Sequence, residues 1–377
     1  MNRRERLMAT LRGEPVDRPA VCFYELNGLD QDPDDPDPFN VYNDPSWRPL
    51  LDLTRERTDR IVMRRLSLAD ASSDPFDGLT ERENWQAGPH RFTRARIRAG
   101  GRTLQRLSRR DRDIDTVWTL EPLVKELDDF KAWLELPLAP AGRVPDPTGV
   151  LQAEAALGEA GIVMLDTWDP LLRVADLFEM GEFTVFALTE NGLMHRALEK
   201  IAAWLLPRVE ATSEALPGRL WRICGSEYAS PPYLSPRLFE EYSVRYVRPM
   251  VAAIQRWGGY ARIHCHGRLR DILDLIAATG CDGLDPIEPP PQGDVEMAYV
   301  RRRHGRQMVL FGNLEIADIT NMPTARFRSK VERALREGTD GEGRGMVLMP
   351  SACPDGRIVS ELTLRNYELM VELAEGF

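Results

Sequence analysis

Apolar residues recur along the chain in eight short runs, and amphipathic stretches separate these runs from one another. The runs are rich in branched and aromatic residues and do not alternate strictly with polar ones. This pattern is typical of parallel strands that are buried on both faces. We therefore predict eight parallel strands: Ala20–Tyr24, Arg60–Met63, Ile162–Leu165, Leu220–Cys224, Tyr260–His264, Gly283–Pro286, Met308–Phe311 and Met346–Met349.

The stretches between the runs carry helix signals. Asn2 can cap a first helix that Gly13 ends, and Ser235 can cap a long helix whose apolar residues recur at helical spacing. The predicted helices are Arg3–Arg12, Pro236–Trp257, Arg268–Ala278, Pro323–Arg336 and Leu362–Ala374. Strands that alternate with helices pair in parallel through right-handed crossovers. We predict an α/β fold: a single (β/α)8 (TIM) barrel over residues 1–377, with an N-terminal helix.

Residues from about 66 to 160 break this alternation. Phe92–Ile97 and Thr103–Leu107 flank the tripeptide Ala99–Gly101, which is typical of a β-hairpin. Leu136–Thr148 is rich in Pro, Gly and Ala and reads as a loop. We interpret the region as an insertion within the barrel and as a candidate cover for its mouth.

Composition narrows the class of protein. The 377 residues are 43% hydrophobic and 29% charged, with a formal net charge of -10, which suits a soluble globular protein with a large core and disfavours a nucleic-acid surface. No apolar run approaches the ~20 residues that cross a bilayer, and the N-terminus lacks a signal-peptide core, so we expect a cytoplasmic protein without a membrane partner. The five scattered cysteines argue against a disulfide framework, which leaves core packing or metal binding.

Polar side chains follow six of the eight predicted strands, where a parallel barrel collects its reactive groups. The candidate catalytic residues at these strand ends are Asp166, Glu227 and Asn313. Other polar or aromatic residues at strand ends are Trp168, Asp169, Asp285, Glu288 and Glu315. These could equally be loop residues without a role in the site.

The most specific motif is His264-Cys265-His266, directly after the fifth run. Residues i and i+2 of an extended segment point to the same side, so the two imidazoles can converge on one metal. Cys353 follows the last run and would have to reach over the barrel mouth to join them. Two imidazoles and a thiolate suit a catalytic zinc ion, with Glu227 as the candidate fourth ligand. The alternative is that the histidine pair is structural.

Several segments in this order resemble the uroporphyrinogen-decarboxylase-like superfamily. The resemblance extends over nearly the whole chain and is most specific from about residue 220 to residue 360. The segments are Arg4–Pro19, Leu234–Tyr242, Arg262–Gly267, Gly280–Glu288 and Phe311–Leu314. The resemblance implies a barrel enzyme that acts on a small-molecule substrate, in a superfamily with several functions.

One branch of that superfamily decarboxylates a porphyrinogen with eight carboxylates and uses no metal. The resemblance implies an Arg-rich segment directly after the first strand, which would hold the acidic side chains of the substrate. Here Cys22–Gly28 contains no arginine. This departure argues against decarboxylation of a porphyrinogen.

The other branch moves methyl groups between a small substrate, or tetrahydrofolate, and a corrinoid protein. The resemblance implies zinc ligands in a His-x-Cys pattern plus a late cysteine. His264 and Cys353 match this pattern, whereas His266 stands where the family has cysteine. The chain lacks an Asp-x-His-x-x-Gly motif, so a corrinoid would come on a separate carrier protein. We predict a zinc-dependent methyltransferase of this branch.

Two alternatives stay open. A decarboxylase-like enzyme that acts on a carboxylated substrate without metal would need arginines at the barrel mouth, and Arg173 and Arg262 are the candidates. A non-enzymatic barrel that binds a ligand without turnover is the third reading. The sequence names neither the methyl donor nor the acceptor.

Overall fold

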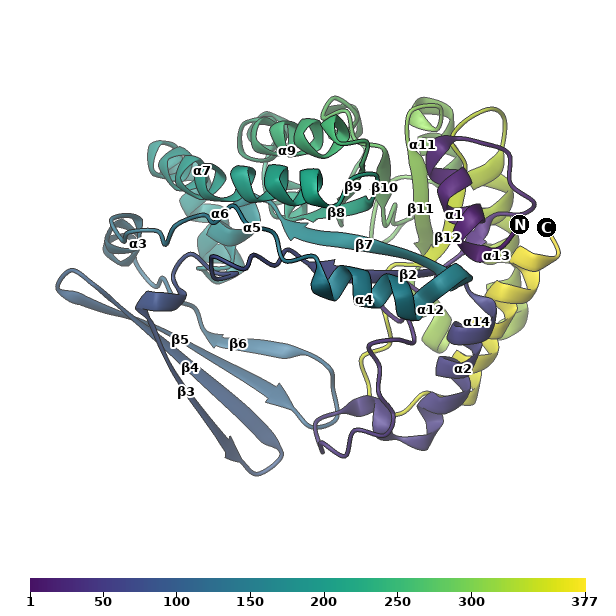
Figure 1. Cartoon of the computed structure of the whole chain (residues 1–377), viewed down its shortest axis with the longest axis horizontal. Helices are drawn as coiled ribbons and strands as arrows, with labels where there is room; N and C mark the ends of the chain where they lie inside the picture. Colours follow the sequence, from purple (N-terminus) through teal and green to yellow (C-terminus); the bar gives the residue numbers. More distant parts are fainter.

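A curled sheet of eight parallel strands forms the centre of the molecule (Figure 1). The computed structural model describes all residues from Met1 to Phe377. The strands follow the order β1-β12-β11-β10-β9-β8-β7-β2 across the sheet. Their bounds are β1 Ala20–Val21, β2 Arg60–Arg65, β7 Gly161–Trp168, β8 Leu220–Cys224, β9 Tyr260–His264, β10 Gly283–Asp285, β11 Val309–Leu314 and β12 Met346–Pro350.

Every predicted run overlaps one of these strands. The bounds of β8 and β9 agree with the prediction, while β7 is longer at both ends and β1 is only two residues long. The sequence order around the sheet is that of consecutive parallel neighbours, as the alternating pattern predicts.

The closed barrel of the prediction is not what the structure shows. β1 and β2 lie at the two ends of the strand order and form no strand ladder with each other. The physical reason is the shortness of β1, which is paired with β12 through Ala20 and Val21 alone. A single backbone hydrogen bond, from Asp59 N–H to the Val21 carbonyl at 2.7 Å, joins the two ends.

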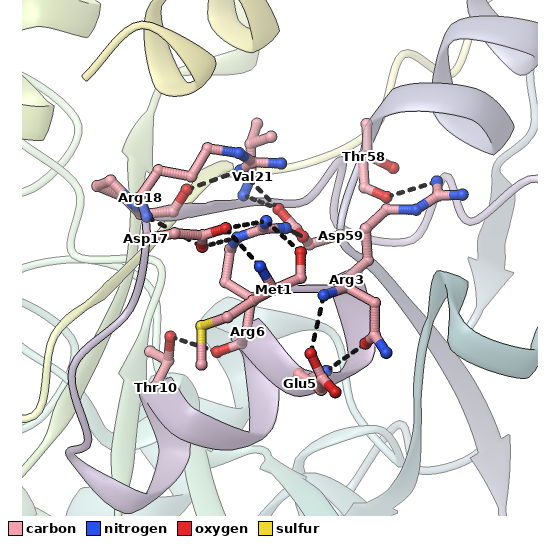
Figure 2. A network of polar contacts seen from close by, with 12 residues as sticks. Met1, Arg3, Glu5, Arg6, Thr10, Asp17, Arg18, Val21, Thr58 and Asp59 are labelled. Carbon is pink, nitrogen blue, oxygen red and sulfur yellow. Dashed lines mark hydrogen bonds and ion pairs between the residues drawn. The ribbon is translucent and has the colours of Figure 1, made fainter.

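A buried carboxylate strengthens this junction (Figure 2). Asp59 precedes β2 and is fully buried. Its oxygens accept hydrogen bonds from Arg6 Nη1 at 2.5 Å, Arg18 Nη1 at 2.9 Å and Val21 N–H at 2.9 Å. Asp17 pairs with Arg6 as well, at 2.7 Å. The N-terminal helix and both ends of the sheet are thus tied together by charge-assisted hydrogen bonds rather than by a ladder.

Helices cover the outside of the curled sheet (Figure 1). Those that follow the strands are α2 Arg48–Arg57, α4 Thr148–Leu157, α5 Pro170–Ala175, α6 Met180–Thr189, α7 Asn191–Ala215, α8 Pro236–Phe239, α9 Arg245–Arg256, α10 Leu273–Ala277, α11 Met297–His304, α12 Ile316–Asn321, α13 Thr324–Thr339 and α14 Glu361–Glu375. The first helix, α1 Arg3–Arg12, has the predicted Asn2 cap, with a full capping box to Glu5, and ends at Gly13 with φ 73°.

The predicted helix Pro236–Trp257 exists as a continuous stretch with an internal π-turn. Ser235 caps α8, the π-helical residues Glu240–Val244 follow, and α9 ends at Arg256. Of the other predicted helices, Pro323–Arg336 and Leu362–Ala374 match α13 and α14 within three residues, while α10 is shorter than Arg268–Ala278.

Two apolar clusters fill the molecule. A cluster of 81 buried residues lies between the sheet and its helices. A smaller cluster of 13 buried residues, which includes Cys22, Ile162 and Phe311, comes from alternate positions along the strands and from Leu7 and Leu11 of α1. It fills the inner face of the sheet. Near the carboxyl ends of the strands, polar side chains take the place of these apolar ones on the inner face.

The insertion holds more structure than the predicted hairpin. It forms a four-stranded antiparallel sheet of β3 Thr80–Ala87, β4 His90–Ala99, β5 Arg102–Asp111 and β6 Val117–Glu121, followed by α3 Leu127–Leu134. β4 and β5 make the predicted hairpin around Gly100 and Gly101. Residues 136–147 form the predicted loop. The sheet extends away from the helices in Figure 1.

Ion pairs hold the inserted sheet against loops at the carboxyl ends of the parallel strands. Arg91 bonds to Asp37 in the loop after β1, at 2.7 Å. Arg106 bonds to Asp176 after α5, at 2.5 Å and 2.9 Å. Ile114 forms an isolated bridge with Gly356 in the loop after β12. The insertion therefore lies beside the mouth, and its role as a cover stays a prediction.

None of the helices is both long enough and apolar enough to cross a membrane.

Candidate functional site

A buried pair of charges lies where β9 and β10 end. The parallel register places His264 beside Asp285, and Arg262 lies two residues earlier on the same face of β9. His264 Nδ1 is 2.8 Å from Asp285 Oδ2, and Arg262 Nη2 donates to the same oxygen at 3.1 Å. Arg262 Nε forms a further ion-pair contact with Oδ1 at 2.7 Å. All three side chains are buried.

Asp285 stays ionised in this setting. Burial by itself would raise its pKa, but the charges of Arg262 and His264 outweigh burial and lower the pKa to about 2. The carboxylate therefore fixes the orientation of the His264 ring through Nδ1 and leaves Nε2 free for other partners.

A second set of buried polar residues adjoins His264. The Tyr24 hydroxyl lies 3.5 Å from His264 Nδ1 and accepts a hydrogen bond from Arg222 Nη1 at 2.5 Å. Arg222 Nε also donates to Asp166 Oδ1 at 2.7 Å. Tyr24 has φ 54°, a left-handed conformation that a tyrosine rarely adopts, so its backbone is strained where it enters the site.

His266 lies next to His264 and has a carboxylate partner of its own. The two imidazole rings are perpendicular, with centroids 4.6 Å apart. His266 Nδ1 is 2.7 Å from Glu288 Oε1, and Gly267 N–H donates to the other oxygen of Glu288 at 2.8 Å. Burial disfavours the charged imidazole, but the hydrogen bond and charge of Glu288 and the charge of Glu227 outweigh it and raise the pKa of His266.

A cavity of about 420 Å³ opens above His266, and we call it the histidine pocket. Residues from the loops after β7, β8, β9 and β10 line it, including Met180, Glu227, Tyr228, Tyr233, His266 and Glu288. The predicted site residues Glu227 and His266 thus share one cavity, with His264 beneath them. The predicted catalytic residue Asp166 is held by Arg222 at the neighbouring strand ends.

Cys353 belongs to a different cavity of about 1010 Å³, which we call the cysteine pocket. Residues from the loops after β1, β11 and β12 and from the turn between β5 and β6 of the insertion line it, among them Tyr24, Glu25, Tyr42, Asp115, Cys353 and Asp355. Cys353 Sγ points to the Phe23 carbonyl oxygen at 3.6 Å. Burial, and next the charge of Glu25, raise the pKa of this thiol far above its usual range, so it stays protonated at neutral pH.

The predicted zinc ligands do not come together. The structure pairs His264 with His266 and places Glu227 in the pocket with His266, but Cys353 lies in the cysteine pocket. No group of three or more His, Cys, Asp or Glu side chains is arranged to hold a metal ion. The reason lies in the order of the strands. Cys353 follows β12, and β12 is three strands away from β9, which carries His264. Zinc binding by these residues therefore stays a prediction.

Asn313, the remaining predicted catalytic residue, lines a third cavity of about 200 Å³ between the loop after β10 and helices α12 and α13. Glu315 lines the same cavity and receives a hydrogen bond from Ser351 Oγ at 3.1 Å. Burial, and next the charge of Glu288, raise the pKa of Glu315 to about 7. Neither residue lines the histidine pocket.

The sequence analysis missed the partners of the two histidines. Asp285 and Glu288 were strand-end residues without an assigned role, and Tyr24 and Arg222 were not candidates. A signal exists for the carboxylates: they follow the strand that comes next after β9, so parallel neighbours bring them beside the histidines. No comparable signal exists for Tyr24, which reaches His264 across the inner face.

The fold and the site define an α/β protein of the barrel-like class, whose polar residues gather at the carboxyl ends of parallel strands. The model of the family "Uroporphyrinogen decarboxylase (URO-D)" matches residues 177–377, which is more than half of the chain. The chain therefore belongs to the URO-D family. The matched part includes the histidine pair, Asp285, Glu288 and Cys353.

Two known proteins are similar to this chain. A uroporphyrinogen decarboxylase from Aliivibrio salmonicida (strain LFI1238) is 26% identical over 224 residues, which cover 54% of this chain and 59% of that protein. The match thus spans less than two thirds of that relative. A methyltransferase from Methanosarcina mazei has a solved structure with a TM-score of 0.60 and 16% identity, covering 100% of this chain and 99% of that one. At this identity the second likeness shows the fold alone.

Proposed function

We propose that this protein is a methyltransferase that acts on a small substrate bound in the histidine pocket. The observation that carries the proposal is the charge at the mouth: no lysine or arginine lines the histidine pocket or the cysteine pocket. A carboxylated substrate needs unpaired cations, because its negative charges lose their hydration on binding. The likeness in fold to a methyltransferase over the whole chain supports the same choice.

The arginines near the site are already neutralised. Arg222 bonds to Asp166 and Glu25, and Arg262 is buried against Asp285. Arg173, the other arginine considered for a carboxylated substrate, bonds to Asp74 at 2.7 Å. Each of these guanidinium groups would have to give up a carboxylate partner before it held a substrate.

His266 is the residue that we assign to proton transfer. Glu288 holds its Nδ1 and raises its pKa, so the imidazolium can donate a proton to a leaving heteroatom. The methyl carbon would accept an electron pair from an attacking nucleophile. The pair of the broken bond would stay on the heteroatom, which takes the proton from His266. Asp285 orients the neighbouring His264 in the same way.

The second reactant would approach from solvent over the mouth. A corrinoid on a separate carrier protein, or tetrahydrofolate, stays the proposed partner for the methyl group. Zinc binding stays a prediction, and we derive no step through a metal because the predicted ligands lie in two pockets.

Decarboxylation is the second candidate, and the family match together with the Aliivibrio salmonicida relative favours it. It would act on the same strand ends and would require a porphyrinogen or another acid to bind beside Glu227 and Glu288. The acidic lining of the pocket makes this the weaker reading.

The two candidates separate in a pair of assays on the purified full chain. Methyl transfer is followed by the absorbance change of free methylcobalamin with candidate acceptors, or of cob(I)alamin with candidate methyl donors. Decarboxylation is followed by release of CO2 from uroporphyrinogen. We expect methyl transfer that the His266→Gln variant loses, and no CO2. Release of CO2 without any methyl transfer would overturn the proposal in favour of the decarboxylase.

A further inference from the structure

Glu227 is the charged residue of the histidine pocket that has no ionic partner. Its carboxylate takes part in no ion pair and accepts one hydrogen bond, from Gly225 N–H at 3.0 Å. Glu288, by contrast, is paired with His266 at 2.7 Å. The pocket therefore holds one compensated carboxylate and one that is not, so its net charge is negative whether His266 is protonated or neutral.

Two aromatic rings and a thioether share the lining with the uncharged residues Ser230, Gly267 and Gln292. Tyr228 follows Glu227 and packs edge-to-face on Phe183, with ring centroids 6.2 Å apart, which fixes its ring beside the cavity. Tyr233 lies half-exposed in the same lining, and Met180 adds a polarisable thioether. Burial, and next the charge of Glu227, raise the pKa of Tyr228 to about 12, so the ring stays neutral and keeps its electron-rich face.

We propose that the histidine pocket binds a cationic alkylammonium group, with Glu227 as its counter-charge and the two tyrosine rings as its walls. The inference rests on the proposed function and names the substrate class of that reaction: a small methylated ammonium compound. Aromatic rings attract such cations through their faces, and the attraction grows when the cation is desolvated. A cavity of about 420 Å³ accommodates a group of this size with room for the rest of a small molecule.

The alternatives fit less well. A neutral methyl ether would leave Glu227 desolvated without a positive charge to compensate it. An anion would meet two carboxylates, and the one cationic group, the imidazolium of His266, is already paired with Glu288. An ammonium group restores the balance of charge, and its methyl groups make van der Waals contact with rings and thioether.

Two probes of the same shape test the charge alone. Choline has a quaternary nitrogen where 3,3-dimethylbutan-1-ol has a quaternary carbon, so the two differ in charge but not in shape. A third probe, 3,3-dimethylbutanoate, has the same apolar group and a negative charge. Isothermal titration calorimetry on the purified full chain measures their affinities in the absence of any methyl acceptor. We expect choline to bind at least about tenfold more tightly than the alcohol, and the carboxylate to bind most weakly.

The Glu227→Gln variant should bring the ratio of choline to alcohol affinity close to one. The matched control is Asp355→Asn, which removes a carboxylate from the cysteine pocket and should leave the ratio unchanged. If Glu227→Gln does not fold, the order of the three probes in the parent protein still decides. Equal affinities, tighter binding of the carboxylate or no binding of choline would overturn the inference.

The outcome is independent of turnover. Preference for choline without methyl transfer in any assay would keep the substrate class and refute the proposed reaction. Methyl transfer from a neutral donor, together with equal probe affinities, would keep the reaction and refute the substrate class.

Discussion

The histidine pocket and the cysteine pocket lie at the same edge of one sheet, yet their reactive groups differ in state. His266, which lines the histidine pocket, and His264 beside it each have a carboxylate on Nδ1, Glu288 at 2.7 Å and Asp285 at 2.8 Å. In the cysteine pocket the thiol of Cys353 faces a backbone carbonyl and is kept protonated by burial. Both cavities are acidic, but only the first holds side chains that are prepared to exchange protons.

A position at the end of a strand is therefore not enough to make a side chain reactive. Cys353 and His266 both follow strands of the same sheet, as the fold requires of a site residue. His266 gains a partner because the next strand, β10, leads into Glu288. Cys353 lies beside the short β1, whose loop supplies Glu25 and no cation to stabilise a thiolate. Neighbouring strands therefore decide which strand-end residue is activated.

The strongest test of the comparison removes Asp285. We expect the Asp285→Ala variant to lower the free energy of unfolding by about 3–5 kcal/mol, because Arg262 would stay buried without its partner. His264 would also lose its orientation, and methyl transfer would fall with it. Urea unfolding followed by circular dichroism measures the loss of stability.

The matched control is Asp355→Ala in the cysteine pocket, whose side chain forms no ion pair and is exposed. Its free energy of unfolding should change by no more than about 0.5 kcal/mol. Equal effects of the two substitutions would show that the buried charges of the histidine site contribute nothing particular to the fold.

The second test compares the two pockets in the reaction. His266→Gln should reduce the rate of methyl transfer by about 10²–10⁴-fold, because glutamine cannot donate the proton that we assign to the imidazolium. Cys353→Ser should leave the rate within about a factor of two, since a thiol that stays protonated is not a reactive nucleophile. Single-turnover absorbance changes of cobalamin measure both. The reverse order of effects would move the reactive centre to the cysteine pocket.

The sequence was sufficient for the parallel sheet because each strand is a short apolar run with a recognisable helix after it. It was not sufficient for the ends of the sheet. Whether a barrel closes depends on one ladder, and here β1 is too short to form it, so Asp59 joins the ends instead. Its contacts to Arg6 and Arg18 involve residues 53 and 41 positions away, which no local pattern reveals.

The part of the site that the sequence predicts consists of residues that are close together along the chain. His264 and His266 share a strand end, and spacing alone places them together. Cys353 was assigned to them because it also follows a strand and because it matches a late zinc-ligand cysteine in the resemblance. Ligand assembly, however, depends on the path of the loop after β12, which composition does not encode. Glu288 and Tyr24 were missed for the same reason. Their roles come from contacts with His266 and His264, which lie far away in the sequence.

A third test uses pH to isolate the His266–Glu288 pair. The pKa of His266 is raised from 6.5, so its contribution to stability is complete below that value and is lost as pH rises through the raised pKa. The pKa of Glu288 is lowered from 4.5, so its contribution is present above that value and is lost as pH falls through the lowered pKa. Parent and Glu288→Gln should therefore differ most between pH 4.5 and 6.5.

The expected difference is about 0.2–1 kcal/mol, because His266 is more than a third exposed and water screens the pair. Urea midpoints measured from pH 4 to about pH 9 trace the profile. A difference that does not change across this range would mean that the two groups do not interact as charges. No similar profile is expected from the cysteine pocket below pH 9, since its thiol does not ionise there.

The smallest expected effect concerns metal. Cys353→Ser should leave the metal content of the purified protein equal to that of the parent, because its sulfur points to the Phe23 carbonyl and not to His264 or His266. Elemental analysis of both proteins, with the His264→Ala, His266→Ala double variant beside them, measures this. Near-stoichiometric zinc that Cys353→Ser loses would mean that the loop after β12 carries the thiol across the mouth to the histidines. The two pockets would then be halves of one metal site. Only the metal-free protein would keep Cys353 apart from the two histidines.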